Sequence, residues 1–200
     1  MQTMKKIYIA TSRQVGHDCI AWAQKNMPPN CLLVDSIGES DIVISVLYEK
    51  LLSPDEIKGR KCYNFHPGSL PDYRGAGCYS WAIINEEESF GITLHVIDEG
   101  IDTGDIISHC YFPIEKEDTA YSLFQKGEKV IYKMFKEWFS ILLTQPFATV
   151  QQDKSKSSLY LRKDLEKAKD LTRFIKAFYF PNKEAAYYYN KQGKKIYINF

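Results

Sequence analysis

Two short motifs contain side chains that could act together on a carbonyl group. In the first, Asn64-Phe65-His66-Pro67-Gly68, the amide and the imidazole lie two residues apart, and such residues of a β-strand project to the same face. Pro67 ends the strand, so the pair stands at its carboxyl end. A carboxamide donor beside an imidazole suits the oxyanion that develops during acyl transfer. The same pair could instead satisfy backbone groups at a strand end, and the motif alone leaves both interpretations open.

The second motif is an acidic loop, Gly100-Ile101-Asp102-Thr103-Gly104-Asp105. Its two glycines allow the backbone to bend tightly and approach a ligand. A carboxylate from this loop beside His66 would raise the pKa of the imidazole, favour its protonated form and fix its orientation. A hairpin turn whose acids serve turn chemistry is the alternative.

Alternating strands and helices must position these motifs. Strands are expected at about 5–10, 31–34, 41–47, 62–65, 91–96 and 105–112, and helices at about 15–25, 77–84 and 118–142, with a further helix starting at Ser53-Pro54. The run 41–47 is almost continuously apolar, which is typical of a parallel strand covered on both faces. This alternation predicts an open α/β sheet. Ligands bind such sheets beyond the carboxyl ends of the strands, which points to loops 11–14, 47–54, 66–77 and 97–104.

The chain is expected to consist of a catalytic domain, residues 1–143, and an appendage, residues 144–200. The appendage begins with a polar connector over 144–158, rich in Gln, Lys and Ser. A charged helix is expected at about 162–178. Two strand-like segments then flank Asn190-Lys191-Gln192-Gly193, which predicts a terminal β-hairpin.

Composition excludes several classes of function. Lys and Arg total 26 against 25 Asp and Glu, a formal net charge of +1, so a broad nucleic-acid surface is not expected. The five cysteines are scattered without zinc or disulfide spacing, and no metal site is expected. His95 and His109 are assigned core or surface roles. A signal peptide and a membrane-spanning run are both missing from the sequence, so a cytoplasmic protein without membrane association is expected.

Two longer segments resemble the folate-dependent formyltransferase family. They are Asn64-Phe65-His66-Pro67-Gly68-Ser69-Leu70-Pro71-Asp72-Tyr73-Arg74-Gly75 and Ile101-Asp102-Thr103-Gly104-Asp105-Ile106, in the family's order and about 40 residues apart. The resemblance extends from about residue 41 to 113. It implies a Rossmann-like core with a mostly parallel twisted sheet flanked by helices. It also implies that Asn64, His66 and Asp102 catalyse direct formyl transfer from N10-formyltetrahydrofolate, without a covalent enzyme intermediate or a metal.

The family's folate pocket corresponds to two segments of this sequence. One is the strand-end segment Tyr48, Glu49, Lys50, Leu51 and Leu52. The other is the loop before the candidate acid, formed by Ile97, Asp98, Glu99, Gly100 and Ile101. Backbone groups do much of this recognition in the family, so the side chains are weakly informative.

The resemblance also bears on the acceptor amine. The purine-pathway enzymes carry a glycine-rich loop where this chain has Ala10-Thr11-Ser12-Arg13-Gln14, and the tRNA enzymes carry a large basic C-terminal domain. The segments 162–165, 173–181 and 81–85 instead look like the sugar-nucleotide branch. The implied acceptor is a nucleotide-linked amino-deoxy sugar, such as a dTDP-amino sugar, destined for O-antigen or other surface glycans.

Several residues are candidates for binding that acceptor. Pyrophosphate needs cationic or backbone N–H partners, and the candidates are Arg13, Arg74 and Arg162. Tyr73 and Tyr79 could stack on a base or sugar, or only pack in the core. Ser12 is expected to cap the first helix, with ligand contact as the alternative.

Four features of the interpretation stay open at this stage. The family often has a proline where this chain reads Ala76-Gly77-Cys78-Tyr79, which leaves the shape of the acceptor pocket in question. The strand-rich tail favours a homodimer. A purine-type formyltransferase acting on another small amine remains an alternative activity. A folate- or sugar-nucleotide-binding module without catalysis is the alternative from a different class.

Overall fold

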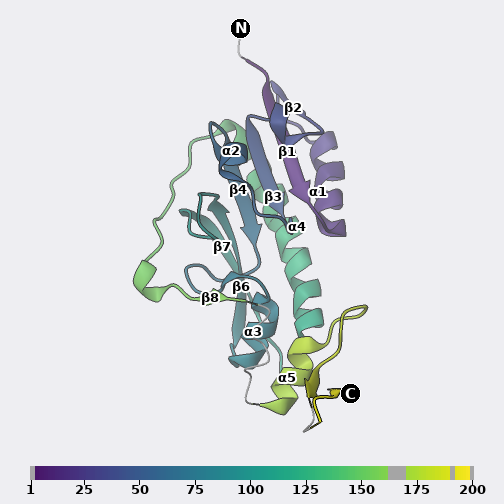
Figure 1. The fold of residues 1–200 in the computed structure, drawn as a ribbon. Coiled ribbons are helices and arrows are strands. Elements are labelled where there is room, and N and C mark those ends of the chain that lie inside the picture. Colours follow the sequence, from purple (N-terminus) through teal and green to yellow (C-terminus); the bar gives the residue numbers. More distant parts are fainter. Residues whose placement is uncertain (1–2, 162–169, 190–191, 199–200) are drawn as a thin grey trace.

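The computed structural model describes residues 3–161, 170–189 and 192–198. Its centre is a six-stranded sheet with the strand order β2-β1-β3-β4-β6-β7 (Figure 1). These strands are β1 (Lys5–Thr11), β2 (Cys31–Leu33), β3 (Ile42–Val46), β4 (Lys61–His66), β6 (Ser89–Val96) and β7 (Ile106–Pro113). Strands β1 to β4 pair in parallel, whereas β6 runs antiparallel to both β4 and β7. The predicted mostly parallel sheet is therefore confirmed.

One face of the sheet is covered by α1 (Gln14–Lys25) and α4 (Ala120–Thr144), which lie side by side in Figure 1. Phe135 of α4 packs on Phe65 of β4, with ring centroids 5.8 Å apart, and on Trp22 of α1 at 6.2 Å. The predicted start of α4 is confirmed, because Thr119 and Ser122 each accept a hydrogen bond from the other's backbone N–H. This packing buries Ile42, Ile44 and Val46 of β3.

The opposite face has a smaller cluster of buried residues. Ala10, Val43 and Cys62 are buried there, and Tyr48, Leu52 and Ile97 are among the half-buried apolar residues packed against them. The short helix α2 (Pro54–Ile57) starts as predicted, with Ser53 and Glu56 forming a capping box. The segments that follow β3 and β6 therefore both pack on this face of the sheet.

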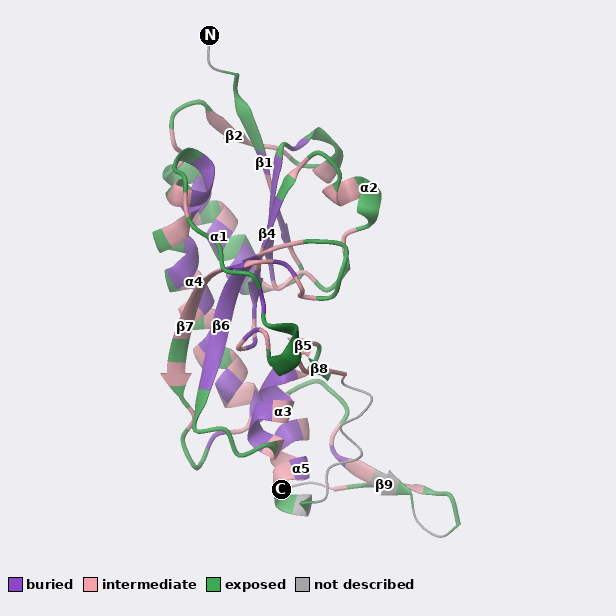
Figure 2. Cartoon of the chain, turned by 90° about the vertical axis from the view of Figure 1, so that its left-hand side faces the viewer, coloured by how far each residue is buried: buried purple, intermediate pink, exposed green. Residues whose placement is uncertain are grey.

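The rest of the chain returns to this core. β5 (Arg74–Gly75) pairs in parallel with β8 (Leu159–Tyr160), and the 3-10 helices η1 (Ile37–Glu39) and η2 (Lys154–Lys156) lie in connecting segments. α5 (Leu171–Phe178) packs on α3 (Cys78–Ile84), and the Ser80 hydroxyl donates to the Ala177 carbonyl at 2.7 Å. Figure 2 shows that buried residues concentrate on β4, β6, α3 and α4.

The predicted terminal hairpin is confirmed. β9 (Tyr187–Tyr189) pairs antiparallel with β10 (Lys195–Tyr197). The predicted helix at 162–178 is present as α5 over its second half, and residues 162–169 lie outside the described part of the chain.

Candidate active site

Strand β4 presents Asn64 and His66 to the cavity, as the two-residue spacing predicts. Both side chains line a cavity of about 610 Å³ at the carboxyl end of the parallel strands, while Phe65 between them is fully buried against α4. This volume lies within the range of small-molecule sites. The sheet rule therefore located the cavity correctly.

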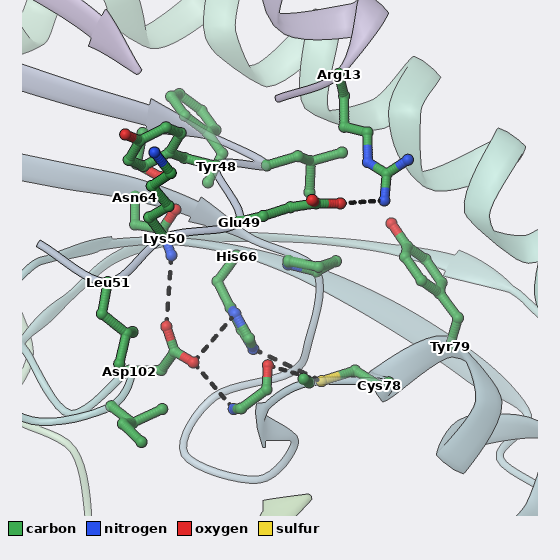
Figure 3. A pocket seen from close by; sticks show the side chains of 18 of the residues that line it. Arg13, Tyr48, Glu49, Lys50, Leu51, Asn64, His66, Cys78, Tyr79 and Asp102 are labelled. Atoms are coloured by element: carbon green, nitrogen blue, oxygen red, sulfur yellow. Dashed lines mark hydrogen bonds and ion pairs between the residues drawn. The ribbon is translucent and has the colours of Figure 1, made fainter. Parts of the chain in front are cut away.

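Asp102, from the loop between β6 and β7, brings the second motif to the same point (Figure 3). Its Oδ2 lies 3.5 Å from Nδ1 of His66 and accepts a hydrogen bond from the Gly75 N–H at 2.9 Å. Its Oδ1 accepts from the Asn64 amide at 3.4 Å. The structure thus unites Asn64, His66 and Asp102, whose sequence positions span two separate motifs.

His95 is a fourth member of this cluster that the sequence analysis did not assign to it. It is 2% exposed, lines the cavity and sits opposite Asn64 in the antiparallel pairing of β4 with β6. Its Nδ1 donates to the Val96 carbonyl at 2.7 Å, so in the neutral ring Nε2 accepts from the Asn64 amide at 3.2 Å. The pairing register of these two strands is the signal that would have identified it.

The protonation of His66 differs from the expectation. Burial lowers the pKa of His66 below its ordinary value, and the opposing effect of Asp102 offsets this only in part. The expected protonated imidazole is therefore wrong for the site as it stands. The neutral ring donates from Nε2 to the Tyr73 carbonyl at 2.7 Å, which leaves Nδ1 facing the carboxylate and able to accept a proton.

Asp102 is held in the ionised form. Burial raises the pKa of this carboxyl. The positive charge that His66 gains on protonation, His95 and the Gly75 N–H together outweigh burial and hold the pKa well below the usual range. A buried carboxylate beside a neutral imidazole stabilises any proton that the ring later takes up. The pair is therefore suited to a reaction in which a proton arrives as bonds form.

One side of the cavity consists of segments that directly follow two strands, and we call it the strand-end wall. It contains the whole predicted segment after β3 and three residues of the predicted loop after β6: Tyr48, Glu49, Lys50, Leu51, Leu52, Ile97, Gly100 and Ile101. Asp98 and Glu99 are not among the described lining residues. The Asp98 carboxylate instead accepts from the Gly100 N–H at 3.1 Å and the Thr103 hydroxyl at 2.6 Å, so it serves the turn.

Another part of the lining draws residues from four distant positions, and we call it the assembled wall. Its members are Arg13, Phe124, Phe180 and Lys183. The Phe180 ring lies 5.4 Å from that of Phe124, and the Arg13 guanidinium lies 5.9 Å from the Phe124 ring centre and pairs with Glu49. Only Arg13 was predicted, because no local motif marks the other three.

The remaining acceptor candidates have different surroundings. Tyr79 lines the cavity, but its ring stacks on Phe90 with centroids 4.6 Å apart, which favours the packing interpretation. The prediction that Ser12 caps the first helix is wrong. Arg13 occupies the cap position of α1, and the Ser12 hydroxyl accepts from the Glu49 N–H at 3.2 Å.

Tyr73 and Arg74 are not among the described residues that line the cavity. The Tyr73 ring stacks on Tyr160 at 4.8 Å, and its hydroxyl donates to Glu87 at 2.6 Å. Arg74 pairs through its backbone with β8. Packing between the connector and the core therefore accounts for both positions, and Arg162 lies outside the described residues.

The described part of the chain contains neither a candidate metal site nor a helix that could span a membrane. Residues 3–161, 170–189 and 192–198 contain no group of three or more His, Cys, Asp or Glu side chains that could hold a metal ion. Among the same residues, every helix is too short or too polar to cross a membrane.

Comparison with known proteins supplies a family. The sequence model of the formyl transferase family matches residues 24–138, more than half of the chain. The bifunctional polymyxin resistance protein ArnA of Wigglesworthia glossinidia brevipalpis is 42% identical over 61% of this chain, and the methionyl-tRNA formyltransferase of Thermodesulfovibrio yellowstonii is 42% identical over 43% of it. The chain spans only 19% and 29% of the length of these curated relatives.

Solved structures share the fold over nearly the full length. A 4-N formyltransferase from Francisella tularensis superposes with a TM-score of 0.83 at 19% identity, covering 100% of this chain and 98% of its own. An N-formyltransferase from Helicobacter canadensis, solved with folinic acid and dTDP-3-aminofucose, has a TM-score of 0.78 at 23% identity, covering 91% and 83%. At these identities the likeness establishes the fold.

Proposed function

This chain belongs to the formyl transferase family, and we propose that it transfers a formyl group from N10-formyltetrahydrofolate to the primary amine of a nucleotide-linked amino-deoxy sugar. The observation that carries the proposal is the cluster of buried His66 with half-buried Asn64 and ionised Asp102 in the lining of a cavity of about 610 Å³. An amide donor, a neutral imidazole and a carboxylate are the groups that acyl transfer to an amine requires.

The first step is attack of the neutral amine on the formyl carbon. A carbon–nitrogen bond forms and the carbonyl oxygen becomes an oxyanion. The Asn64 amide donates to it after one of its N–H groups leaves His95 Nε2 or Asp102 Oδ1, the two acceptors that it now contacts. The His66 ring donates to the oxyanion once it has taken up a proton.

Proton movement completes the reaction. Neutral His66 accepts the proton that the amine loses, and ionised Asp102, 3.5 Å away, stabilises the resulting imidazolium. The proton then passes to the departing folate nitrogen as the bond from that nitrogen to the formyl carbon breaks. His66 returns to its neutral form, so atoms and charge balance over one turnover.

The strand-end wall is the proposed binding site for the folate donor. Tyr48, Leu51, Leu52, Ile97 and Ile101 give this side an apolar character, which suits a flat pterin ring. Its position beside Asn64 and Asp102 would bring the formyl group to the candidate catalytic residues. The Helicobacter canadensis neighbour, solved with folinic acid, supports a folate donor for this fold.

The assembled wall is the proposed binding site for the acceptor. Arg13 and Lys183 provide two cations and Phe124 and Phe180 provide aromatic faces, which together suit a diphosphate next to a base or sugar. The Arg13–Glu49 ion pair would have to open when a phosphate binds. The same neighbour's complex with dTDP-3-aminofucose supports this class of acceptor.

A purified-protein assay tests the proposal. N10-formyltetrahydrofolate is offered with a panel of dTDP- and UDP-amino sugars, glycinamide ribonucleotide and charged initiator methionyl-tRNA, and formylated products are detected by mass spectrometry. We expect formylation of at least one sugar nucleotide. Formylation of glycinamide ribonucleotide or of methionyl-tRNA alone would replace the proposed acceptor. Tight folate binding without transfer to any amine would favour a binding module.

The proposal extends to assembly and context. The hairpin places Tyr187, Tyr189, Tyr197 and Lys195 on one face, with Tyr189 61% and Tyr197 52% exposed, and such a face favours pairing with a second subunit. We place the homodimer in the cytoplasm, where its product would enter O-antigen or other surface-glycan synthesis. A monomeric mass by light scattering, unchanged up to high protein concentration, would contradict the dimer.

A further inference from the structure

The connector between α4 and β8 contacts the backbone of the loop that carries Asp102, the candidate catalytic acid. Gln152, in this connector, is 9% exposed although the residues on both sides of it are exposed. Its side-chain amide donates to the backbone carbonyls of Asp102 at 2.9 Å and Gly104 at 2.7 Å. Because Gln152 is not among the described residues lining the cavity, it reaches the site only through the backbone of the acidic loop.

That backbone is in a conformation that requires support. Asp102 has φ of +52°, in the left-handed region where the Cβ of an L-residue crowds the chain. Such residues persist when surrounding contacts hold them. The two hydrogen bonds from Gln152 are contacts of this kind, because they fix the carbonyl of Asp102 itself and that of the residue two positions later.

The same connector also supports the side chain of Asp102. Val150 and Ile106 exchange two backbone hydrogen bonds of 2.8 Å. Further along, β8 pairs with β5. The Arg74 N–H donates to the Ser158 carbonyl just before β8, and the Ala76 N–H donates to the Tyr160 carbonyl, both at 3.0 Å. Between them, Gly75 donates its N–H to the Asp102 carboxylate at 2.9 Å.

We propose that Gln152 is a positioning residue for formyl transfer, which aims the Asp102 carboxylate at His66 by holding the left-handed turn. The predicted effect of Gln152 on the reaction rate rests on the proposed function. The structural content of the inference, that Gln152 sets the distance between Asp102 and His66, is independent of the substrate. Misplacement of a catalytic group by about 1 Å can cost roughly 100-fold in rate.

The kinetic test uses Gln152→Met, which keeps the volume and removes both donors, and Gln151→Met, its exposed neighbour, as the matched control. We expect the kcat of Gln152→Met to fall about 10- to 100-fold, with KM for both substrates within about twofold of wild type. The pair is repeated in an Asp102→Ala background under single-turnover conditions. There, Gln152→Met should have no further effect, because it acts through a carboxylate that is already gone. Equal losses in both backgrounds would show a merely structural role and overturn the proposal.

A second readout needs no substrate. The pKa of His66 is measured by NMR on protein with ¹³C-labelled histidine. The groups that face this ring are Asp102, His95 and Cys78, together with the Tyr73 carbonyl. Gln152→Met should lower the pKa of His66 by moving Asp102 away, and Gln151→Met should leave it unchanged.

If Gln152→Met fails to fold, Gln152→Asn is measured in the same titration, since it keeps an amide but shortens its reach. A His66 pKa equal to that of wild type in a folded Gln152 variant would overturn the inference. A wild-type protein that formylates no amine would instead refute the proposed function, and the His66 titration would still decide the role of Gln152.

Discussion

The two walls of the cavity are built in different ways. The strand-end wall comes from two short stretches, each of which directly follows a strand of the sheet, β3 or β6. The assembled wall joins the start of α1, the start of α4 and the segment after α5, through the side chains of Arg13, Phe124, Phe180 and Lys183. A wall made by the fold is suited to a constant partner, such as the proposed donor. A wall made of separate side chains can change one residue at a time, which suits a variable acceptor.

The largest expected effects on kcat come from the candidate catalytic residues, which belong to neither wall. Asn64→Ala, His66→Ala and Asp102→Ala should each lower kcat by about 100- to 1000-fold, the usual cost of losing one oxyanion donor or its proton partner. KM for donor and acceptor should change little, because neither wall is altered. Steady-state kinetics with both substrates varied checks this. His17→Ala, on the exposed face of α1, is the control and should match wild type.

The next largest effect is expected from Arg13→Ala, which tests whether the assembled wall binds the acceptor. Removing a cation that contacts phosphate costs a charge-assisted hydrogen bond, so KM for the acceptor should rise about 10- to 100-fold. KM for N10-formyltetrahydrofolate should stay within about twofold. Glu49→Gln is the matched variant, since it frees Arg13 from its ion pair and should leave acceptor binding intact or improved. An Arg13→Ala variant with raised folate KM and unchanged acceptor KM would reverse the assignment of the walls.

A smaller effect is expected at the strand-end wall. Ile101 is 38% exposed and lines the cavity, so Ile101→Ala removes apolar surface that would contact the donor. The donor would cover only the exposed part of this side chain, and about one to two methylene groups correspond to roughly a 4- to 15-fold rise in folate KM. Lys50→Ala is the control. The family resemblance implies that backbone groups do much of the folate recognition, so removing this charged side chain should change folate KM less than twofold. Equal effects of both variants would contradict the backbone interpretation.

The walls also differ in how well the sequence predicts them. Periodicity and capping identified β3, β4 and the start of α4, because those signals are local to Ile42–Val46, Asn64 to His66 and Thr119. The sheet rule then located the strand-end wall without knowledge of any contact. Phe180 and Lys183 lie far along the chain from Arg13, and only the docking of α5 on α3 brings them to the cavity.

Two histidines of the site show more clearly what the sequence could not predict. His95 could be placed beside Asn64 only by knowing that β6 pairs with β4 in that register. The protonation of His66 was predicted from its neighbour Asp102 alone, whereas the burial that dominates its pKa depends on the packing of α3 and the whole cavity around it. Pairwise chemistry is visible in sequence motifs, but burial is a property of the complete fold.

The smallest expected effect is the pH dependence of stability that results from the burial of His66. His66 is neutral and its pKa is lowered in the folded protein, so the unfolded chain binds more protons than the folded one as pH falls below about 6.5. The contribution of His66 to stability is therefore present above that pH and is lost as pH drops towards the folded pKa, with a limiting slope of about 1.4 kcal/mol per pH unit. Urea unfolding at several pH values between 7 and 5 measures this loss.

His66→Gln should flatten that pH dependence, while His17→Gln should leave it unchanged because His17 is exposed. Asp102 does not account for the effect, because its lowered pKa affects stability only below about pH 4, where the unfolded carboxyl takes up its proton. An unfolding free energy that is the same at pH 7 and pH 5, or a slope that survives in His66→Gln, would mean that the cavity does not exclude water from this ring. The neutral imidazole that the proposed proton transfer requires would then need another origin.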